Sequence, residues 1–217
     1  MTTPRASARS PQRRADRRVE ILQVARRLFA AEGVGPVTAG RIAKEAAISP
    51  GNLYYWFASK EDIVRTLFRE WLAVSAIGAA LPSDPPGRLA LLWDRAGAQR
   101  RVNEDYAFFH RELATVLEGD PVLAAEYRAV YAERVEQFAA LAESLIAAGL
   151  LRRPEPPTTV RALVRVLWLV AETADPFAHA IGDPELDATD LTRAVLAPFL
   201  TDAGRAALGI GDETEAD

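Results

Sequence analysis

Residues 49–62 read SPGNLYYWFASKED, and this stretch decides how the front of the chain folds. Ser49 can cap a helix, and Pro50 suits the first helical position, where its missing N–H costs nothing. Side chains lie about 100° apart around a helix, so the four aromatic residues 54–57 cannot share one core. Leu53 and Phe57, four residues apart, are expected to anchor the helix. Tyr54, Tyr55 and Trp56 then face partly or wholly outward.

The flanking segments predict three more helices around this one. A first helix is expected to begin near Asp16 and to end at Gly33, with one buried stripe. Thr38 is a good N-cap for a short second helix, and Ser59 is one for a fourth helix that continues to about Ala80. Two short helices joined by a tight turn, after a longer supporting helix, form a helix-turn-helix unit.

The rest of the chain predicts helices at about 88–101, 104–118, 121–148, 157–180 and 188–207, separated by glycine and proline punctuation. No segment argues for a strand, so the fold class is all-α. The expected organisation is a disordered basic arm (1–15), a helix-turn-helix domain (16–58), a linking helix (59–80), a second helical domain (81–208) and a disordered tail (209–217).

Composition narrows the function further. Residues 1–60 carry eleven Lys and Arg against four Asp and Glu, whereas residues 61–217 carry fifteen against twenty-six, so only the front suits a polyanion. The chain has no cysteine and two histidines, which argues against a metal site, and nothing calls for a cofactor. We find no signal peptide and no apolar run of about 20 residues, and expect a cytoplasmic protein without membrane contact.

The first 65 residues resemble the TetR family of bacterial transcriptional regulators. The resemblance rests on fixed spacing through the first two helices and on residues 48–55 (ISPGNLYY), followed by Phe57 and Ser59-Lys60-Glu61. It covers under a third of the chain strongly. It implies an N-terminal three-helix DNA-binding domain, a C-terminal ligand-binding and dimerisation domain, and a homodimer that places its third helices in the major groove of an operator.

Carried onto this chain, the resemblance implies a set of DNA-binding residues in the second, third and fourth helices. They are Thr38, Ala39, Gly40, Arg41, Ser49, Pro50, Gly51, Asn52, Tyr54, Tyr55, Trp56 and Lys60. Tyrosine hydroxyls can donate to phosphates, and Asn52 can bind an adenine edge or hold a phosphate.

Several of these roles have structural alternatives. Tyr55 can instead pack on the supporting helix, Trp56 on the following helix, and Lys60 can simply be solvated. Trp56 stands where the family often has a phosphate-contacting histidine. Ala47 stands where the turn commonly has glycine, so we expect a left-handed alanine at a cost of about 1 kcal/mol. The arginines of residues 5–18 can enter a minor groove or only solubilise the chain.

The rear half offers a candidate ligand pocket and a candidate dimer interface. The pocket candidates are Trp93, Tyr106, Phe109, His110, Tyr127, Tyr131, Trp168 and Glu172, which can equally form a plain core. The interface candidates are Leu163, Leu167, Val170, Leu191, Val195 and Phe199, on the two last long helices, whose apolar stripes can also pack within one subunit.

The hypothesis is a DNA-binding transcriptional regulator, a repressor released from a palindromic operator by a small apolar or amphipathic ligand. Its partners are then double-stranded DNA, a second copy of the chain and an unidentified small molecule. One alternative is a regulator without ligand, controlled by concentration or a protein partner. An enzyme in the rear domain lacks a convincing nucleophile and base, so we expect no enzymatic activity.

Overall fold

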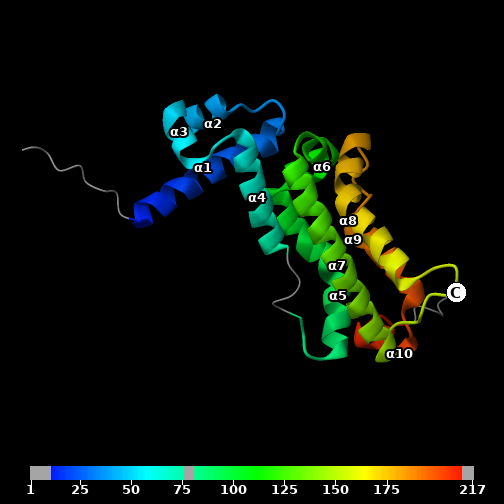
Figure 1. Ribbon diagram of the computed structural model, residues 1–217. Helices are drawn as coiled ribbons and strands as arrows, with labels where there is room; N and C mark the ends of the chain where they lie inside the picture. Colours follow the sequence, from blue (N-terminus) through cyan, green and yellow to red (C-terminus); the bar gives the residue numbers. More distant parts are fainter. Residues whose placement is uncertain (1–10, 76–80, 212–217) are drawn as a thin grey trace, which may run out of the picture. The chain divides into compact units, whose positions relative to one another are not determined.

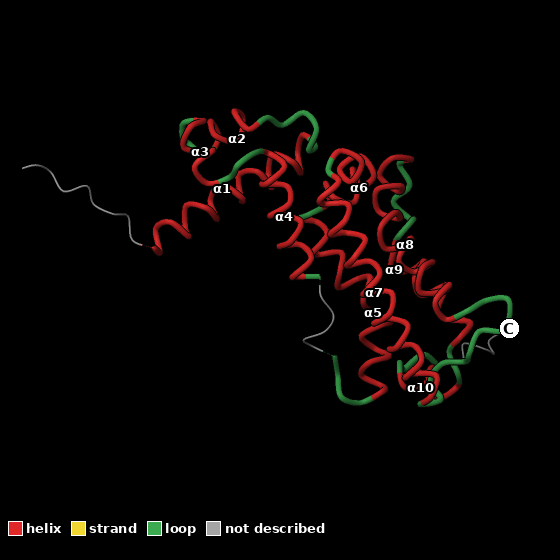
Figure 2. Tube along the Cα trace, in the orientation of Figure 1, coloured by secondary structure: helices red, strands yellow, loops and turns green. Residues whose placement is uncertain are grey.

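A computed structural model describes residues 11–75 and 81–211 of the chain. The chain divides into two compact units, Met1–Ala73 and Val74–Asp217. Throughout the described residues the secondary structure is helical, without strands (Figure 2). An isolated bridge joins Leu151 and Leu200. The predicted all-α fold is confirmed.

The first unit contains four helices: α1 (Pro11–Glu32), α2 (Ala39–Glu45), α3 (Pro50–Trp56) and α4 (Lys60–Val74) (Figure 1). Each helix contributes large side chains that are almost completely buried, among them Phe29 from α1, Ile42 from α2, Leu53 from α3 and Phe68 from α4. Burying such a side chain contributes about 2 kcal/mol, which offsets the low intrinsic stability of two seven-residue helices.

The helix starts follow the predicted caps. The Thr38 hydroxyl accepts from the backbone N–H of Arg41 at 3.1 Å, and the Ser49 hydroxyl from that of Asn52 at 3.2 Å. Ser59 accepts from the N–H of Asp62 at 3.3 Å, and the Asp62 carboxylate accepts in turn from the N–H of Ala58. These bonds satisfy donors that a helix N-terminus leaves without partners.

One predicted boundary of this unit differs from the structure, and one lies outside the described residues. Helix α1 begins at Pro11, five residues before the predicted start, because proline is well suited to the first turn and the next residues are good helix formers. Residues 1–10 of the predicted arm lie outside the described residues. Helix α4 is described to Val74, and the predicted continuation over residues 76–80 also lies outside them.

The second unit contains α5 (Pro85–Asp105), α6 (Ala107–Gly119), α7 (Pro121–Ala147), α8 (Val160–Ile181), α9 (Ala188–Leu196), a 3-10 turn (Ala197–Phe199) and α10 (Asp202–Ala207). Helix α8 packs against both α7 and α9, and α5 packs against α7, α9 and α10. Eight leucines form the centre of this core: Leu89, Leu92, Leu141, Leu145, Leu150, Leu151, Leu196 and Leu200.

The prediction of one helix over residues 188–207 is wrong. Pro198 lacks the N–H that a continuing helix needs, so α9 ends in the 3-10 turn. Leu200 is extended and pairs with Leu151, and the Thr201 hydroxyl then caps α10 by accepting from the N–H of Gly204. The break turns the end of the chain back onto the loop between α7 and α8.

The described residues contain neither a membrane-spanning helix nor a metal-binding cluster. None of their helices is long and apolar enough to cross a membrane. They also contain no group of three or more His, Cys, Asp or Glu side chains that could hold a metal ion.

Candidate nucleic-acid interface

Helix α3 turns two tyrosine rings toward solvent. Tyr54 is 56% exposed and Tyr55 is 63% exposed, whereas Leu53 and Phe57 are buried. The predicted division of the aromatic run by direction is therefore confirmed, and the alternative in which Tyr55 packs on α1 does not fit. A short helix with two exposed tyrosines at its centre presents hydroxyl donors and flat rings to an approaching partner.

Trp56 is oriented differently from the two tyrosines. Its ring is half-buried and meets Tyr55 edge-on, with ring centroids 5.1 Å apart and planes at 86°. The indole N–H is buried, and no hydrogen-bond acceptor for it lies within the described residues. Of the two roles expected for Trp56, packing agrees with this placement, because a buried N–H cannot reach a phosphate without a rearrangement.

The turn between α2 and α3 has the strained geometry that its sequence predicts. Ala47 has a φ of +52°, the left-handed region that glycine usually occupies. The backbone N–H groups of Ala47 and Ile48 donate to Lys44 O at 3.1 Å and Ala43 O at 3.0 Å, and so close the end of α2. The tight turn is kept at the expected cost of about 1 kcal/mol.

The beginning of α2 carries Thr38, Ala39, Gly40 and Arg41. The Arg41 guanidinium lies 3.6 Å from a Glu32 carboxylate oxygen and 3.4 Å from one of Glu45, and its side chain is 44% exposed. Exposed ion pairs of this kind contribute little to stability. The guanidinium can therefore exchange these carboxylates for a phosphate at small cost.

Lys60 is half-buried and bonds to its own unit. Its ammonium group donates to Val34 O at 2.9 Å and to Gly35 O at 3.3 Å, both in the loop between α1 and α2. The N-terminus of α4 is thereby tied to the loop that leads into α2. Sequence reasoning missed this contact, because the two carbonyl groups are some 25 residues away and carry no side-chain signature.

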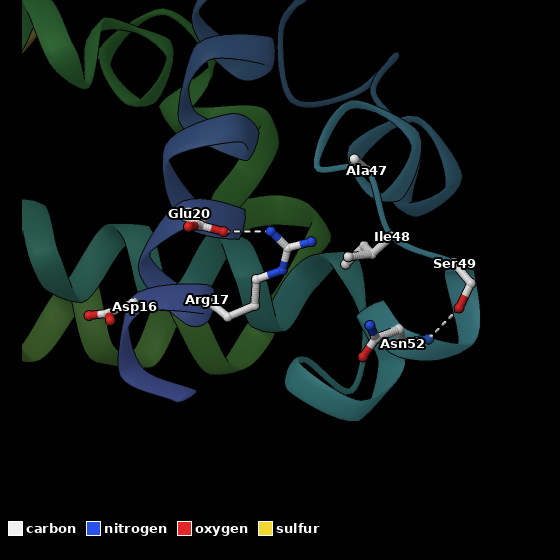
Figure 3. Close-up of a pocket in the computed structure, with 7 residues that line it drawn as sticks. All are labelled: Asp16, Arg17, Glu20, Ala47, Ile48, Ser49 and Asn52. Atoms are coloured by element: carbon white, nitrogen blue, oxygen red, sulfur yellow. Dashed lines mark hydrogen bonds and ion pairs between the residues drawn. The ribbon is translucent and has the colours of Figure 1, made fainter. Parts of the chain in front are cut away.

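A hollow of about 560 Å³ lies between the N-terminal part of α1 and the turn before α3 (Figure 3). Its lining residues are Asp16, Arg17, Glu20, Ala47, Ile48, Ser49 and Asn52. Arg17 donates to the Glu20 carboxylate at 2.5 Å and to Ala46 O at 3.1 Å. Asn52 and Ser49 border the hollow from α3, so this hollow adjoins the start of the candidate recognition helix.

Arg18, like Arg17, interacts with its own unit. Its guanidinium lies 4.9 Å from the centre of the Phe57 ring and donates to the Thr66 hydroxyl of α4 at 3.4 Å. Both arginines had been grouped with the basic arm in the sequence. The structure instead places them on α1, where they contact α2, α4 and the end of α3.

The second unit holds a polar cluster between α6, α7 and α8. His110 Nδ1 lies 2.9 Å from one Glu172 oxygen, and Tyr127 donates to the other at 3.3 Å. Trp168 Nε1 donates to the Tyr127 hydroxyl at 3.2 Å, and Tyr131 meets the Trp168 ring edge-on. Burial and the Glu172 charge raise the pKa of Tyr127 well above its usual value, so its hydroxyl stays protonated.

The other pocket candidates lie in plain cores. Tyr106 and Phe109 are buried and stack with centroids 6.4 Å apart. Trp93 packs against the leucine core, and the Arg193 guanidinium lies 5.7 Å from its ring centre. Five of the eight predicted pocket residues are thus brought together in the polar cluster, and three are not.

Helices α8 and α9 expose several large apolar side chains, which together we call the α8–α9 apolar face. It consists of Val166, Leu169, Phe177, Ile181 and Leu191, which are between 38% and 61% exposed. Among the six predicted interface residues, Leu191 belongs to this face. Leu163, Val170 and Val195 are half-buried, and Leu167 and Phe199 pack against the leucine core. The sequence did not predict Val166, Leu169, Phe177 and Ile181 as interface residues, because α8 has apolar residues on more than one side and its periodicity does not show which side is exposed.

The first unit has the architecture of a helix-turn-helix DNA-binding protein. Helix α1 supports two short helices, α2 and α3, which are joined by a tight turn, and α3 exposes polar and aromatic side chains. The chain belongs to the TetR family of bacterial transcriptional regulators. The model described as "Bacterial regulatory proteins, tetR family" matches residues 21–67, and that described as "Bacterial transcriptional repressor" matches residues 79–208, more than half of the chain. The family is one of regulators, not of enzymes.

Some relatives resemble the chain in sequence over a short segment, and others resemble it in structure over most of its length. The transcriptional repressor KstR2 of Mycolicibacterium smegmatis is 41% identical over 63 residues, which are 29% of this chain and 31% of that protein. The chain thus aligns with about a third of the length of the curated relatives it matches.

A solved TetR-family regulator from Marinobacter aquaeolei VT8 has a TM-score of 0.71 and 27% identity, and the match covers 89% of this chain and 96% of that one. A TetR regulator structure from Haloarcula marismortui has the same TM-score at 21% identity, covers 86% of this chain and all of that one, and shows the fold alone.

Proposed function

We propose that the protein is a homodimeric repressor that binds a palindromic DNA operator in the cytoplasm and leaves it when a small apolar or amphipathic molecule binds the second unit. The observation that carries the DNA-binding part is the exposed face of α3. Tyr54 and Tyr55 lie on that face, within one helical turn of Asn52. The buried side chains of Leu53 and Phe57 hold the opposite side of the helix in the core of the first unit. In this orientation the helix can enter a major groove without refolding.

The remaining predicted contacts support the same role. Arg41 is half-exposed at the start of α2, and Thr38 and Ser49 already orient the N-terminal N–H groups of the two short helices. Phosphate contacts from such positions fix the register of a protein on DNA, and base edges are then within reach of Asn52. Gly51 has open space around its Cβ position, which allows close approach of a DNA strand.

The α8–α9 apolar face supports the dimer. Val166, Leu169 and Phe177 lie along one side of α8 at intervals of three and eight residues, and all are exposed in the single subunit. A group of exposed large apolar side chains on one helix is typical of an interaction site. A two-fold axis through this face would present two helix-turn-helix units to two half-sites.

The polar cluster of the second unit supports ligand control. It joins α6, α7 and α8 through an ion pair and two hydrogen bonds between side chains, so a ligand that displaces one of these contacts would affect the packing of three helices. Release from DNA then requires that the ligand bind the DNA-incompetent arrangement better than the competent one.

Selection of bound sequences from a random duplex library tests the DNA-binding proposal. We expect a palindromic consensus whose half-sites lie about one helical turn apart, or a multiple of it. Failure to enrich any sequence at low salt would overturn the proposal.

Ligand control needs a separate test, because a regulator controlled only by concentration would give the same consensus. A thermal-shift screen is expected to find a compound that stabilises the protein and weakens its binding to the selected duplex. A broad screen without such a compound would favour the ligand-independent alternative and leave the DNA-binding proposal intact.

A further inference from the structure

We propose that Arg17 is a positioning residue that holds the strained turn before α3, and that it does so from within the first unit and not as a contact to DNA. The inference rests on the proposed DNA-binding function, because its consequence is a correctly oriented recognition helix. It concerns a residue of α1 that no sequence pattern assigned to the turn.

The Arg17 guanidinium borders the hollow and acts as a clamp through two bonds, of which Figure 3 shows the one to Glu20. One guanidinium nitrogen of Arg17 donates to Glu20 at 2.5 Å, and the other terminal nitrogen donates to Ala46 O at 3.1 Å. Ala46 is buried and directly precedes Ala47, the residue with a φ of +52°. The arginine is therefore fixed on its own helix by Glu20 and bonded to the backbone carbonyl group of the residue before the strained Ala47.

This bond acts where the turn is least stable. Ala46 is the C-cap of α2, so its carbonyl group lies at the negative end of the helix dipole and lacks a partner within that helix. A cation that donates to it stabilises the end of α2. A left-handed alanine persists only when surrounding contacts hold it, and the Arg17 bond is such a contact on the adjacent residue.

The consequence for recognition follows from the short distance along the chain. Ala47 and Ile48 are the two residues that separate Ala46 from Ser49, the N-cap of α3. A change in the Ala47 dihedral angles would rotate α3 as a whole, together with Asn52, Tyr54 and Tyr55. Arg17 thus controls the direction of the DNA-facing side chains without having to touch DNA.

An arginine at this place could instead bind a phosphate, and substitutions separate the two roles. Lysine keeps the charge that a phosphate needs, but its single ammonium group cannot reproduce the planar fork that reaches two acceptors. If Arg17 is a clamp, Arg17→Lys and Arg17→Met weaken DNA binding to a similar extent, about tenfold. If it is a phosphate contact, Arg17→Lys keeps most of the affinity.

Glu20→Ala distinguishes the clamp from a purely electrostatic role, because the two predict opposite changes in DNA affinity. This change removes a negative charge from a DNA-binding unit, so electrostatics alone would tighten binding to a polyanion. The clamp model expects weaker binding, because Arg17 loses the carboxylate that fixes it. Alanine is a strong helix former, so the variant keeps α1 intact.

The experiment measures fluorescence anisotropy of a duplex selected by the wild-type protein, over a series of salt concentrations. The clamp predicts a higher Kd for Arg17→Met, Arg17→Lys and Glu20→Ala with an unchanged salt slope. It also predicts that Ala47→Gly, which removes the strain, reduces the effect of Arg17→Met in the double variant. A slope lowered by about one in Arg17→Met, with additive effects of Ala47→Gly, would overturn it.

The melting temperatures of the same variants test the clamp without any DNA, and therefore independently of the proposed function. If the wild-type protein binds no duplex, the proposed function fails, while the clamp still predicts a lower Tm for Arg17→Met and a smaller loss in the Ala47→Gly background. Equal losses of Tm in both backgrounds would then reject the clamp.

Discussion

At the residue scale, replacing Lys60 is expected to change both the stability of the protein and its binding to DNA. Its ammonium group bonds two loop carbonyls, and the resemblance to the family implies a phosphate contact. We expect Lys60→Ala to lower the free energy of unfolding by about 1 kcal/mol, because the loop loses these bonds. We also expect weaker binding to every DNA sequence and a salt slope lower by about one. An unchanged slope with reduced stability would restrict Lys60 to the loop.

Asn52 carries a prediction about sequence preference. Its side chain lies in the first turn of α3 beside the hollow, where a bidentate bond to an adenine is feasible. Replacing Asn52 with alanine should change the selected base at one position in each half-site, at a cost of about 1–3 kcal/mol for the wild-type operator. The same consensus from both proteins would assign Asn52 to a phosphate.

The residues themselves explain how much of this site is predictable. Leu53, Phe57 and the two exposed tyrosines follow from helical spacing, and the left-handed Ala47 follows from its place in the turn. Lys60 and Arg17 do not, because their partners are backbone carbonyl groups distant in sequence. The sequence leaves two roles open for Trp56 for a related reason, since the burial of its N–H depends on the residues packed around it.

At the element scale, the packing of α10 against the loop between α7 and α8 predicts how a substitution at Gly204 changes stability. A Cβ added at Gly204 in α10 would overlap the backbone carbonyl oxygen of Leu150, which cannot move without breaking its bond to Thr201. Gly204→Ala is expected to destabilise the protein by about 1–3 kcal/mol in urea denaturation.

Gly119→Ala is the matched control for that substitution. Gly119 ends α6, and a Cβ there meets nothing within 4 Å. Alanine should be neutral or slightly stabilising at this position. Similar destabilisation by both substitutions would show that the contact with Leu150 is not responsible.

The same segment shows where element prediction stops. Most helices of the chain were predictable from caps and glycine or proline punctuation, whereas the single helix over 188–207 was not correct. The break depends on Pro198 and on the pairing of Leu200 with Leu151, a contact across some 50 residues. The start of α1 was missed because its first residues have no apolar periodicity to mark a helix.

At the scale of the whole molecule, the α8–α9 apolar face predicts how the subunits associate. Leu169 is 61% exposed, and we expect Leu169→Glu to give monomers in sedimentation velocity at micromolar concentration, because an interface would bury an unpaired charge. Affinity for the full palindrome should fall more than affinity for one half-site.

Val122→Glu provides the control for that change. Val122 is an apolar residue of α7 with 49% exposure, and it is not part of the α8–α9 apolar face. This variant should remain dimeric. Unchanged association of Leu169→Glu would place the interface elsewhere on the molecule.

Contact between the exposed face of α3 and DNA can be measured directly, because the chain has no cysteine. A single thiol is introduced as Tyr54→Cys, or as Val122→Cys in the second unit, and its alkylation rate is measured with and without the selected duplex. We predict that saturating DNA strongly slows alkylation at position 54 and leaves position 122 unchanged. Equal rates at position 54 with and without bound DNA would contradict this contact.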